Sequence, residues 1–211
     1  MKLYSYFRSS ASYRARIALH WKGLPFEYIP ISLLKGAQLS AEYRKINPMA
    51  HVPALEHEGF LVAESMAIIQ YLDEVFAEKP LFPGNPRDKA TVLQLCEVIN
   101  SGIQPLQNLK VQRLLESTYG LQKSDSDGFV RHWISEGLAN LEKLLEHTAG
   151  SFSFGGSVTA ADCFIIPQCV TAKRFGVETA SFPCLHRVFN NALVLEPFKK
   201  AHPEAQPDFQ K

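Results

Sequence analysis

A short segment rich in proline and glycine, EKPLFPGNPR at 78–87, divides the sequence into two parts with different periodicity. Before it, short apolar runs alternate with helix-like segments, whereas after it nearly every segment has the spacing of an amphipathic helix. With 211 residues and 46% hydrophobic composition, the chain can bury two small cores. We therefore predict an α/β domain over residues 1–80, a linker over 81–86 and an all-helical domain over 87–211.

The first part has the order βαβ followed by ββα. This order, in which a strand pair and a helix close the unit, is typical of a thioredoxin-like domain. Gly23 and Pro25 mark the end of its first helix, and Ser40 is placed to cap the second. We predict strands over 2–7, 26–31, 52–55 and 60–63, with EHEG as the turn between the last two, and helices over 10–22, 39–47 and 65–76.

The second part shows helical spacing throughout, separated by loops around TYGLQKSD, TAGSFSFGGS and GVETASFP. Thr159 and Asp162 form a T-x-x-D pattern before one of the apolar helices, and we interpret this pair as a capping box with a purely structural role. The predicted helical segments cover 87–118, 125–147, 159–173 and 184–199.

Charge and composition exclude several classes of function. Twenty-two Lys and Arg against 21 Asp and Glu leave a net charge of +1 with no long run of one sign, so we expect neither a nucleic-acid partner nor a membrane-surface partner. No segment approaches the roughly 20 apolar residues of a membrane span, and the N-terminus lacks the pattern of a signal peptide. The expected partners are small molecules and a second copy of the chain.

The cysteines show neither a CxxC pair nor the close Cys and His spacing of a zinc site, so no metal site is predicted. All of them lie in apolar periodic segments. We interpret them as buried, reduced thiols of a cytoplasmic protein. The four are Cys96, Cys163, Cys169 and Cys184.

Two adjacent hydroxyl groups, those of Ser9 and Ser10, stand where the first helix begins. A serine at this position can cap the helix by accepting a hydrogen bond from an orphan backbone N–H. The same N–H groups and the helix dipole also favour an anion or a thiolate. The stretch alone leaves both interpretations open.

Two further places in the first part could bind a ligand. Val52-Pro53 opens the third predicted strand, where proline is tolerated only at a strand start or in a special turn, and a cis peptide bond is one explanation. Glu64-Ser65 stands at the start of the next helix, where a hydroxyl and free N–H groups can bind a carboxylate or simply cap the helix.

The stretch SSASYRARIAL, Ser9 to Leu19, is similar to the signature of the zeta-class glutathione transferases, the family of maleylacetoacetate isomerases. Other landmarks resemble the family in the same order over essentially the whole chain, and the ordered set is far more specific than any one of them. One departure is Ala11, which stands where the family usually has a cysteine. The further landmarks are Asn47-Pro48 with Val52-Pro53, Glu64 to Ile69, Gly102 to Asn108 and Arg174-Phe175.

The resemblance implies glutathione as cofactor and assigns residues to its parts. It makes Ser9 the first choice as donor to the thiolate, with Ser10 as its neighbour. It implies that the backbone of Val52 pairs with the cysteinyl part, as an added strand would. It assigns the γ-glutamyl carboxylate to Ser65 and the amino group to Glu64, and we expect His51 and Gln107 at the glycyl end. Because the attacking sulfur belongs to glutathione, Ala11 affects only side reactions of the missing cysteine.

The resemblance also implies a dicarboxylic enedione as substrate, and guanidinium groups bind carboxylates with two parallel hydrogen bonds. Arg8 and Arg174 are the candidates for this role, although both could be ordinary surface ion pairs. Lys110 lies three residues after Gln107, which predicts the same helical face and a possible third cation.

The activity implied is a glutathione-dependent cis–trans isomerisation of maleylacetoacetate to fumarylacetoacetate in the catabolism of tyrosine and phenylalanine, by reversible thiolate addition. Three alternatives stay open: a maleylpyruvate isomerase, a general glutathione S-transferase or peroxidase that consumes glutathione, and a non-catalytic binding protein with the same fold. The resemblance further implies a homodimer, in which the N-terminal domain of one subunit meets the helical domain of the other.

Overall fold

The computed structural model describes residues 1–210. The contacts of the chain divide it into two compact units, which are described separately. The first unit combines Met1–Leu81 with the residues from Leu193 onward, and the second is Phe82–Ala192. The sequence placed the residues after 192 in the helical domain, whereas their contacts group them with the first unit.

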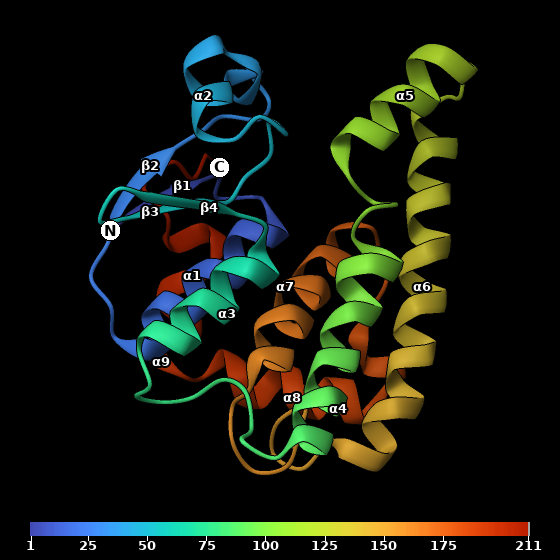
Figure 1. Ribbon diagram of the computed structural model, residues 1–211. Helices are drawn as coiled ribbons and strands as arrows, with labels where there is room; N and C mark the ends of the chain where they lie inside the picture. The colour runs from blue at the N-terminus through green and yellow to red at the C-terminus, as the bar shows by residue number, and fades with distance from the viewer. Residues whose placement is uncertain (211) are drawn as a thin grey trace. The chain divides into compact units, whose positions relative to one another are not determined.

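The first unit contains a four-stranded mixed sheet with the strand order β2-β1-β3-β4 (Figure 1). Strand β1 pairs in parallel with β2 and antiparallel with β3, and β3 pairs antiparallel with β4. This topology confirms the predicted thioredoxin-like arrangement. The strands are β1 (Lys2–Ser5), β2 (Glu27–Pro30), β3 (Ala54–His57) and β4 (Phe60–Ala63).

The β3–β4 hairpin turns on two residues instead of the four that were predicted. Glu58 and Gly59 have φ of 51° and 81°, and His57 pairs directly with Phe60. Two consecutive positive φ angles define a turn whose twist matches that of the flanking strands. The strand pattern therefore extends through Glu56 and His57, which the sequence had assigned to the turn.

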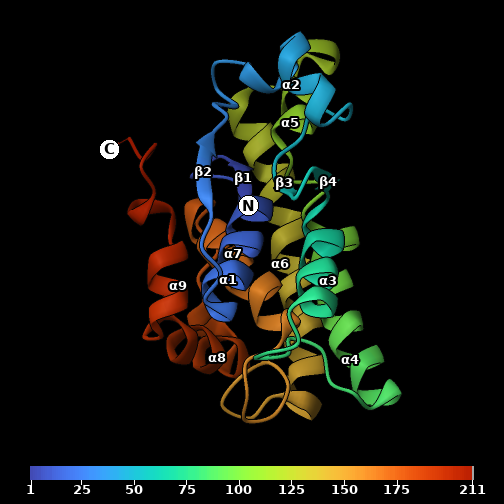
Figure 2. The same ribbon diagram turned by 60° about the vertical axis from the view of Figure 1, so that its left-hand side comes forward.

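Helices α1 (Ser10–Lys22) and α3 (Ser65–Val75) lie side by side next to the sheet, and α9 (Glu196–Ala201) packs along α1 (Figures 1 and 2). The left-handed Gly23, with φ of 70°, ends α1 as predicted. Ser40 caps α2 (Ala41–Ile46) by accepting a hydrogen bond from the backbone N–H of Tyr43. These local predictions are confirmed. They could be made from the sequence because a cap depends on residues within one helical turn.

The second unit is all-helical, but the predicted segment 87–118 is not one helix. After α4 the chain passes through a π-helical turn. Pro105 then interrupts the series of helical hydrogen bonds, because it has no N–H to donate. Asn108 caps a new helix. The helices that begin in this unit are α4 (Pro86–Glu97), η2 (Val98–Ile103), α5 (Leu109–Tyr119), α6 (Lys123–Thr148), α7 (Ala160–Arg174), the short η3 (Thr179–Ser181) and α8 (Pro183–Leu193).

The predicted segment 184–199 is also divided, because α8 ends at Leu193 and α9 begins at Glu196. Pro197 occupies the first turn of α9, where its missing N–H has no helical partner to lose. Of the helices within residues 1–210, none combines the length and the apolar composition that a membrane span requires.

The capping box before α7 is confirmed. The carboxylate of Asp162 is fully buried and accepts hydrogen bonds from the backbone N–H and hydroxyl of Thr159, at 2.8 and 3.2 Å. Its other oxygen accepts the N–H and hydroxyl of Ser153, at 2.9 and 2.5 Å. Asp162 thus joins the loop after α6 to the first turn of α7.

We expect Asp162→Ala to lower the free energy of unfolding by about 3 kcal/mol, because four buried donors lose their acceptor. For a chain of this size the melting temperature should fall by roughly 6–12 °C. The matched control is Asp127→Ala, which removes a partly exposed i,i+4 partner of Lys123 and should cost less than about 0.5 kcal/mol. Equal melting temperatures for the two variants would contradict a structural role of Asp162.

Candidate active site

One end of the sheet gathers three of the segments that the sequence singled out. Tyr4 pairs with Ala54, and Ala54 pairs with Ala63. In antiparallel pairs this register places the C-terminal ends of β1 and β4 beside the N-terminal end of β3. The segments attached to these three strand ends are Tyr6–Ser9, Val52-Pro53 and Glu64-Ser65, and α1 and α3 both begin there.

Ser9 is both the last residue of a tight turn and the N-cap of α1. Its backbone N–H donates to the carbonyl of Tyr6 at 3.0 Å, and its hydroxyl oxygen accepts the N–H of Ser12 at 3.1 Å. The capping interpretation is therefore confirmed. A serine hydroxyl that accepts one hydrogen bond still has its hydrogen to donate, so capping leaves Ser9 able to stabilise an anion. Ser9 and Ser10 are half-buried, and Arg8 is exposed beside them.

Two arginines of α1 shape this end of the sheet, although the sequence analysis did not single them out. Arg14 and Arg16 are 1% and 0% exposed. Burial lowers the pKa of Arg16 to about 10, so its guanidinium stays charged at neutral pH. Arginine is rarely buried without partners, and the signal in the sequence is that these two arginines stand among Tyr13, Ala15 and Ile17, which are apolar residues of α1.

Ser65 is 3% exposed, and its hydroxyl oxygen accepts a hydrogen bond from Nη1 of Arg14 at 3.1 Å. The hydroxyl hydrogen can still be donated to an anion. Glu64, which precedes α3, has φ of 69° and makes no side-chain capping bond. The first N–H groups of α3 are thus not capped by Glu64, and a buried guanidinium lies behind Ser65. This arrangement suits a carboxylate ligand.

The Val52-Pro53 peptide bond is cis. Strand β3 begins at Ala54, two residues later than predicted, because Pro53 has no N–H to donate to the ladder. The carbonyl of His51, the residue before Val52, accepts hydrogen bonds from the hydroxyl of Tyr43 at 2.6 Å and from the side-chain amide of Asn47 at 2.9 Å. Within residues 1–210 no backbone hydrogen bond of Val52 is found, so its N–H and C=O can pair with an extended ligand.

Three predicted site residues belong to the second unit. Gln107 is 7% exposed, and its carboxamide exchanges two hydrogen bonds with Gln168, at 3.0 and 2.9 Å. Gln107 precedes α5, whereas the exposed Lys110 lies in its first turn. The prediction that they share a helical face is therefore wrong, because the helix starts only at Leu109.

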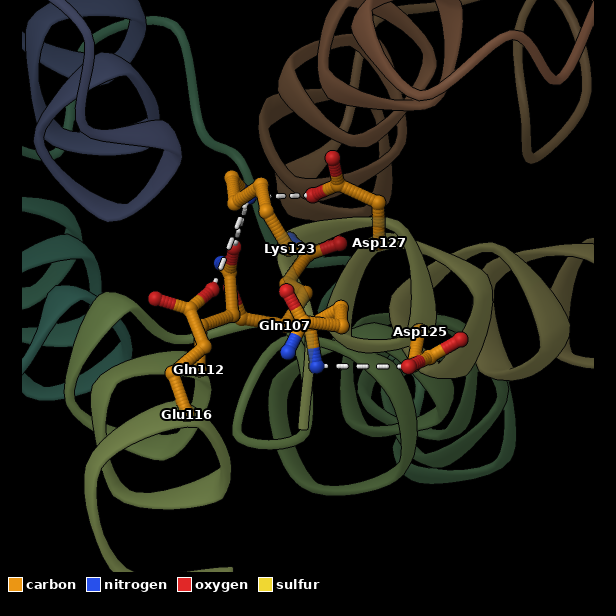
Figure 3. A network of polar contacts seen from close by, with 7 residues as sticks. Gln107, Gln112, Glu116, Lys123, Asp125 and Asp127 are labelled. Carbon is orange, nitrogen blue, oxygen red and sulfur yellow. Dashed lines mark hydrogen bonds and ion pairs between the residues drawn. The ribbon is translucent and has the colours of Figure 1, made fainter. Parts of the chain in front are cut away.

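A polar network continues from Gln107 along α5 and α6 (Figure 3). The carbonyl of Gln107 accepts the amide of Gln112 at 2.8 Å, and Lys123 donates to the Gln112 side chain at 3.5 Å. Lys123 also pairs with Asp127 and lies 3.9 Å from Glu116. This network links the start of α5 to the start of α6.

Arg174, the third of these residues, is the last residue of α7 and is exposed. Its guanidinium lies over the ring of Phe175, 5.7 Å from the centroid. A planar guanidinium can stack on an aromatic ring through its face and bind a carboxylate through its edge. Across residues 1–210, no cluster of three His, Cys, Asp or Glu side chains could hold a metal ion.

A thioredoxin-like unit with hydroxyl groups at two helix N-termini, followed in the chain by a helical unit, defines the architecture of a glutathione transferase. The family model described as "Glutathione S-transferase, N-terminal domain" matches residues 1–74. A zeta-class glutathione S-transferase of Euphorbia esula is 44% identical over 209 residues, which cover 99% of this chain and 92% of that protein. The chain belongs to the zeta class of glutathione transferases.

Solved structures agree with this assignment. A bacterial zeta-class maleylpyruvate isomerase in its holo form has a TM-score of 0.97 and 34% identity, with full coverage of both chains. The maleylacetoacetate isomerase of Anaeromyxobacter dehalogenans 2CP-1, with glutathione bound in its active site, has a TM-score of 0.89 and 41% identity. That match covers 98% of this chain and 96% of the other.

Proposed function

We propose that this protein is a glutathione-dependent isomerase that converts maleylacetoacetate to fumarylacetoacetate. The observation that carries the proposal is the pair of serines, Ser9 and Ser65, each at the start of a helix. Each accepts one hydrogen bond from the protein and keeps a hydroxyl hydrogen for a ligand. Two anionic groups of glutathione, its thiolate and its γ-glutamyl carboxylate, match these two donors. The glutathione-bound isomerase at 41% identity supports the same conclusion.

The candidate residues would hold the cofactor as follows. Ser65 and the N–H groups of α3 would bind the γ-glutamyl carboxylate, and Glu64 its amino group. The backbone of Val52 would pair with the cysteinyl part. His51 and Gln107 are the candidates for the glycyl end. For Gln107 this role requires its carboxamide to give up its hydrogen bonds to Gln168.

Bound glutathione supplies a thiolate that adds reversibly to the cis alkene, so that rotation about the new single bond and elimination leave the trans product. Ser9 would donate its hydroxyl hydrogen to the sulfur, and the N-terminus of α1 would lower the pKa of the thiol, as helix N-termini do. Ser10, the first residue of α1, is the second candidate donor.

The exposed cations Arg8, Lys110 and Arg174 would hold the carboxylates of the substrate. Of the three, Arg8 is the nearest in sequence to Ser9, the proposed donor to the thiolate. For Lys110 and Arg174 the role rests on charge and exposure, and mutation tests it.

A second candidate is maleylpyruvate isomerase, since solved enzymes with that name and with the name maleylacetoacetate isomerase match this fold equally, each at a TM-score of 0.97 and 34% identity. The purified protein should be mixed with maleylacetoacetate and with maleylpyruvate, each with and without a catalytic amount of glutathione, while loss of the cis isomer and the concentration of free thiol are followed. We expect faster turnover of maleylacetoacetate with constant thiol. Faster turnover of maleylpyruvate would reassign the substrate, and stoichiometric loss of thiol would indicate a transferase or a peroxidase.

We also propose a cytoplasmic homodimer that acts in the catabolism of aromatic amino acids, in which the N-terminal domain of one subunit meets the helical domain of the other. The edge strand β4 supports association because it exposes Phe60 and Leu61, at 50% and 42%. The cytoplasmic assignment rests on the free thiols, of which Cys96, Cys163 and Cys169 are buried.

Light scattering should therefore give about twice the chain mass of 23.7 kDa. Replacing Phe60 and Leu61 together by serine should shift the protein toward monomer, whereas replacing the still more exposed Val194 should not. A wild-type monomer that binds glutathione would contradict the dimer.

A further inference from the structure

Side chains from two distant parts of the chain hold the turn that carries Ser9. Arg16 donates to the carbonyls of Tyr6 and Phe7, at 3.3 and 3.1 Å. From the other end of the sequence, Oδ2 of Asp208 accepts the backbone N–H of Phe7 at 3.1 Å. Both polar groups of the Phe7 backbone are therefore bound by side chains, two residues before Ser9.

The segment that carries Asp208 is itself firmly anchored in the first unit. Oδ1 of Asp208 accepts the hydroxyl of Tyr28, in β2, at 2.6 Å. Just before it, the carboxamide of Gln206 donates to the carbonyls of Lys200 and His202, each at 2.8 Å. Arg16 also reaches this segment, because its Nε donates to the carbonyl of Ala201 at 2.9 Å. The segment is thus a fixed support.

Apolar packing joins the same support to a second candidate glutathione-binding segment. The ring of Phe209 meets that of Phe7 edge-on, with centroids 5.5 Å apart. Phe209 packs against a cluster of buried side chains that includes Tyr6, Phe7 and Val52. The residues around Asp208 therefore contact the turn before Ser9 and the cluster that contains Val52.

The charges at this point are balanced. The guanidinium of Arg16 and the carboxylate of Asp208 attract each other, so the carboxylate does not make the turn electronegative. Burial and the bond to Asp208 raise the pKa of Tyr28, which keeps its hydroxyl protonated as a donor. A carboxylate has two acceptor oxygens for these two donors, whereas a carboxamide has only one.

We propose that Asp208 is a positioning residue for the reaction, which holds the Phe7 peptide so that the hydroxyl of Ser9 stays directed at the reacting sulfur. This inference rests on the proposed function. A catalytic donor must be held within a fraction of an ångström of its productive position, and small displacements cost rate more than they cost ground-state binding. Among the backbone hydrogen bonds of residues 1–210, one lies inside this turn, from the N–H of Ser9 to the carbonyl of Tyr6, so the turn depends on side chains for further support.

The test is Asp208→Asn, which keeps the size of the side chain and removes one acceptor. The matched control is Glu204→Gln, the same chemical change at an exposed position of the same segment. We expect Asp208→Asn to lower isomerase kcat roughly three- to tenfold, with the Kd for glutathione changed less than about twofold. The pH at which bound glutathione ionises, followed by the ultraviolet absorbance of the thiolate, should move upward toward that of free glutathione. Glu204→Gln should match the wild type.

A second variant, Tyr28→Phe, removes the anchor of Asp208 and leaves its bond to Phe7; it should shift kcat and the ionisation pH in the same direction by less. This variant keeps the test open if Asp208→Asn does not fold. Unchanged kcat and ionisation pH in the folded variants would overturn the proposal, and so would a lower melting temperature with an unchanged ionisation pH.

Hydrogen exchange of the backbone amides in residues 6–10 separates this inference from the proposed function. The positioning role requires faster exchange there in Asp208→Asn than in Glu204→Gln, whatever the substrate. If the wild type neither binds glutathione nor isomerises either diacid, the proposed function fails, and the exchange still shows whether Asp208 holds the turn. Equal exchange in both variants would overturn the inference even in an active enzyme.

Discussion

Replacing Ser9 by alanine is expected to lower isomerase kcat by ~10²-fold, the loss typical of a single oxyanion-type donor. The Kd for glutathione should change little, because the hydroxyl serves the thiolate and not the peptide groups of the cofactor. The hydroxyl hydrogen of Ser9 is free for this purpose, since its oxygen is the acceptor in the bond to the N–H of Ser12. Single-turnover rates at saturating glutathione measure the effect directly.

The same substitution removes a helix cap, which costs about 1 kcal/mol of stability, so the control must remove an equivalent cap elsewhere. Ser40→Ala does so, because the oxygen of Ser40 accepts the N–H of Tyr43 at the same distance of 3.1 Å. We expect Ser40→Ala to lower the melting temperature and to retain near-normal kcat. If Ser9→Ala is equally active at saturating glutathione, Ser9 has no part in the reaction. Ser10→Ala should matter less, and the reverse order would transfer the role to Ser10.

Replacing Arg174 by alanine is expected to lower kcat/KM for the diacid roughly tenfold to hundredfold, mainly through KM. A bidentate contact between a guanidinium and a carboxylate is worth about 1.5–3 kcal/mol, which corresponds to this range. Glutathione affinity should stay nearly unchanged, because the strand and helix ends that we assign to glutathione, around Ser9 and Ser65, belong to the first unit. Arg174→Lys should recover only part of the loss, since an ammonium keeps the charge but not the planar fork.

Lys173→Ala is the matched control, because Lys173 is the neighbouring exposed cation in the last turn of α7. An uncharged electrophile assayed beside the diacid supplies a second control. If Arg174→Ala depresses both substrates equally, its role is structural, through its contact with Phe175. Arg8 and Lys110 would then be the next candidates for the carboxylate.

Much of the candidate site could be predicted because its parts are local. The caps at Ser9, Ser40 and Thr159 each involve a partner three residues away, so the pattern of residue types was enough. The turn at Glu58-Gly59 shows the limit of such patterns, because Glu is an unusual residue at positive φ. The pairing of His57 with Phe60 determines that turn, not the preference of Glu58.

The partners of the buried polar side chains could not be predicted. Gln107 looked like a surface residue or a ligand for the glycyl end, yet its carboxamide pairs with Gln168, 61 positions away. No role was predicted for Arg16 or Asp208, yet both hold the turn before Ser9. Nothing within one helical turn of these residues indicates such partners, because the contacts form only when distant segments pack.

From the sequence by itself come the family, the change from an α/β part to a helical part near residue 80, and the serines that begin α1 and α3. These features depend on short motifs, on apolar periodicity and on capping residues, all of which act over a few positions. Only the tertiary structure decided that the strand register brings Ser9, Val52 and Ser65 to one end of the sheet. It also decided that the residues from Leu193 onward join the first unit and that Asp208 binds the turn before Ser9. Both depend on which distant side chains satisfy one another's hydrogen bonds and share a core, and that is settled only when the chain packs.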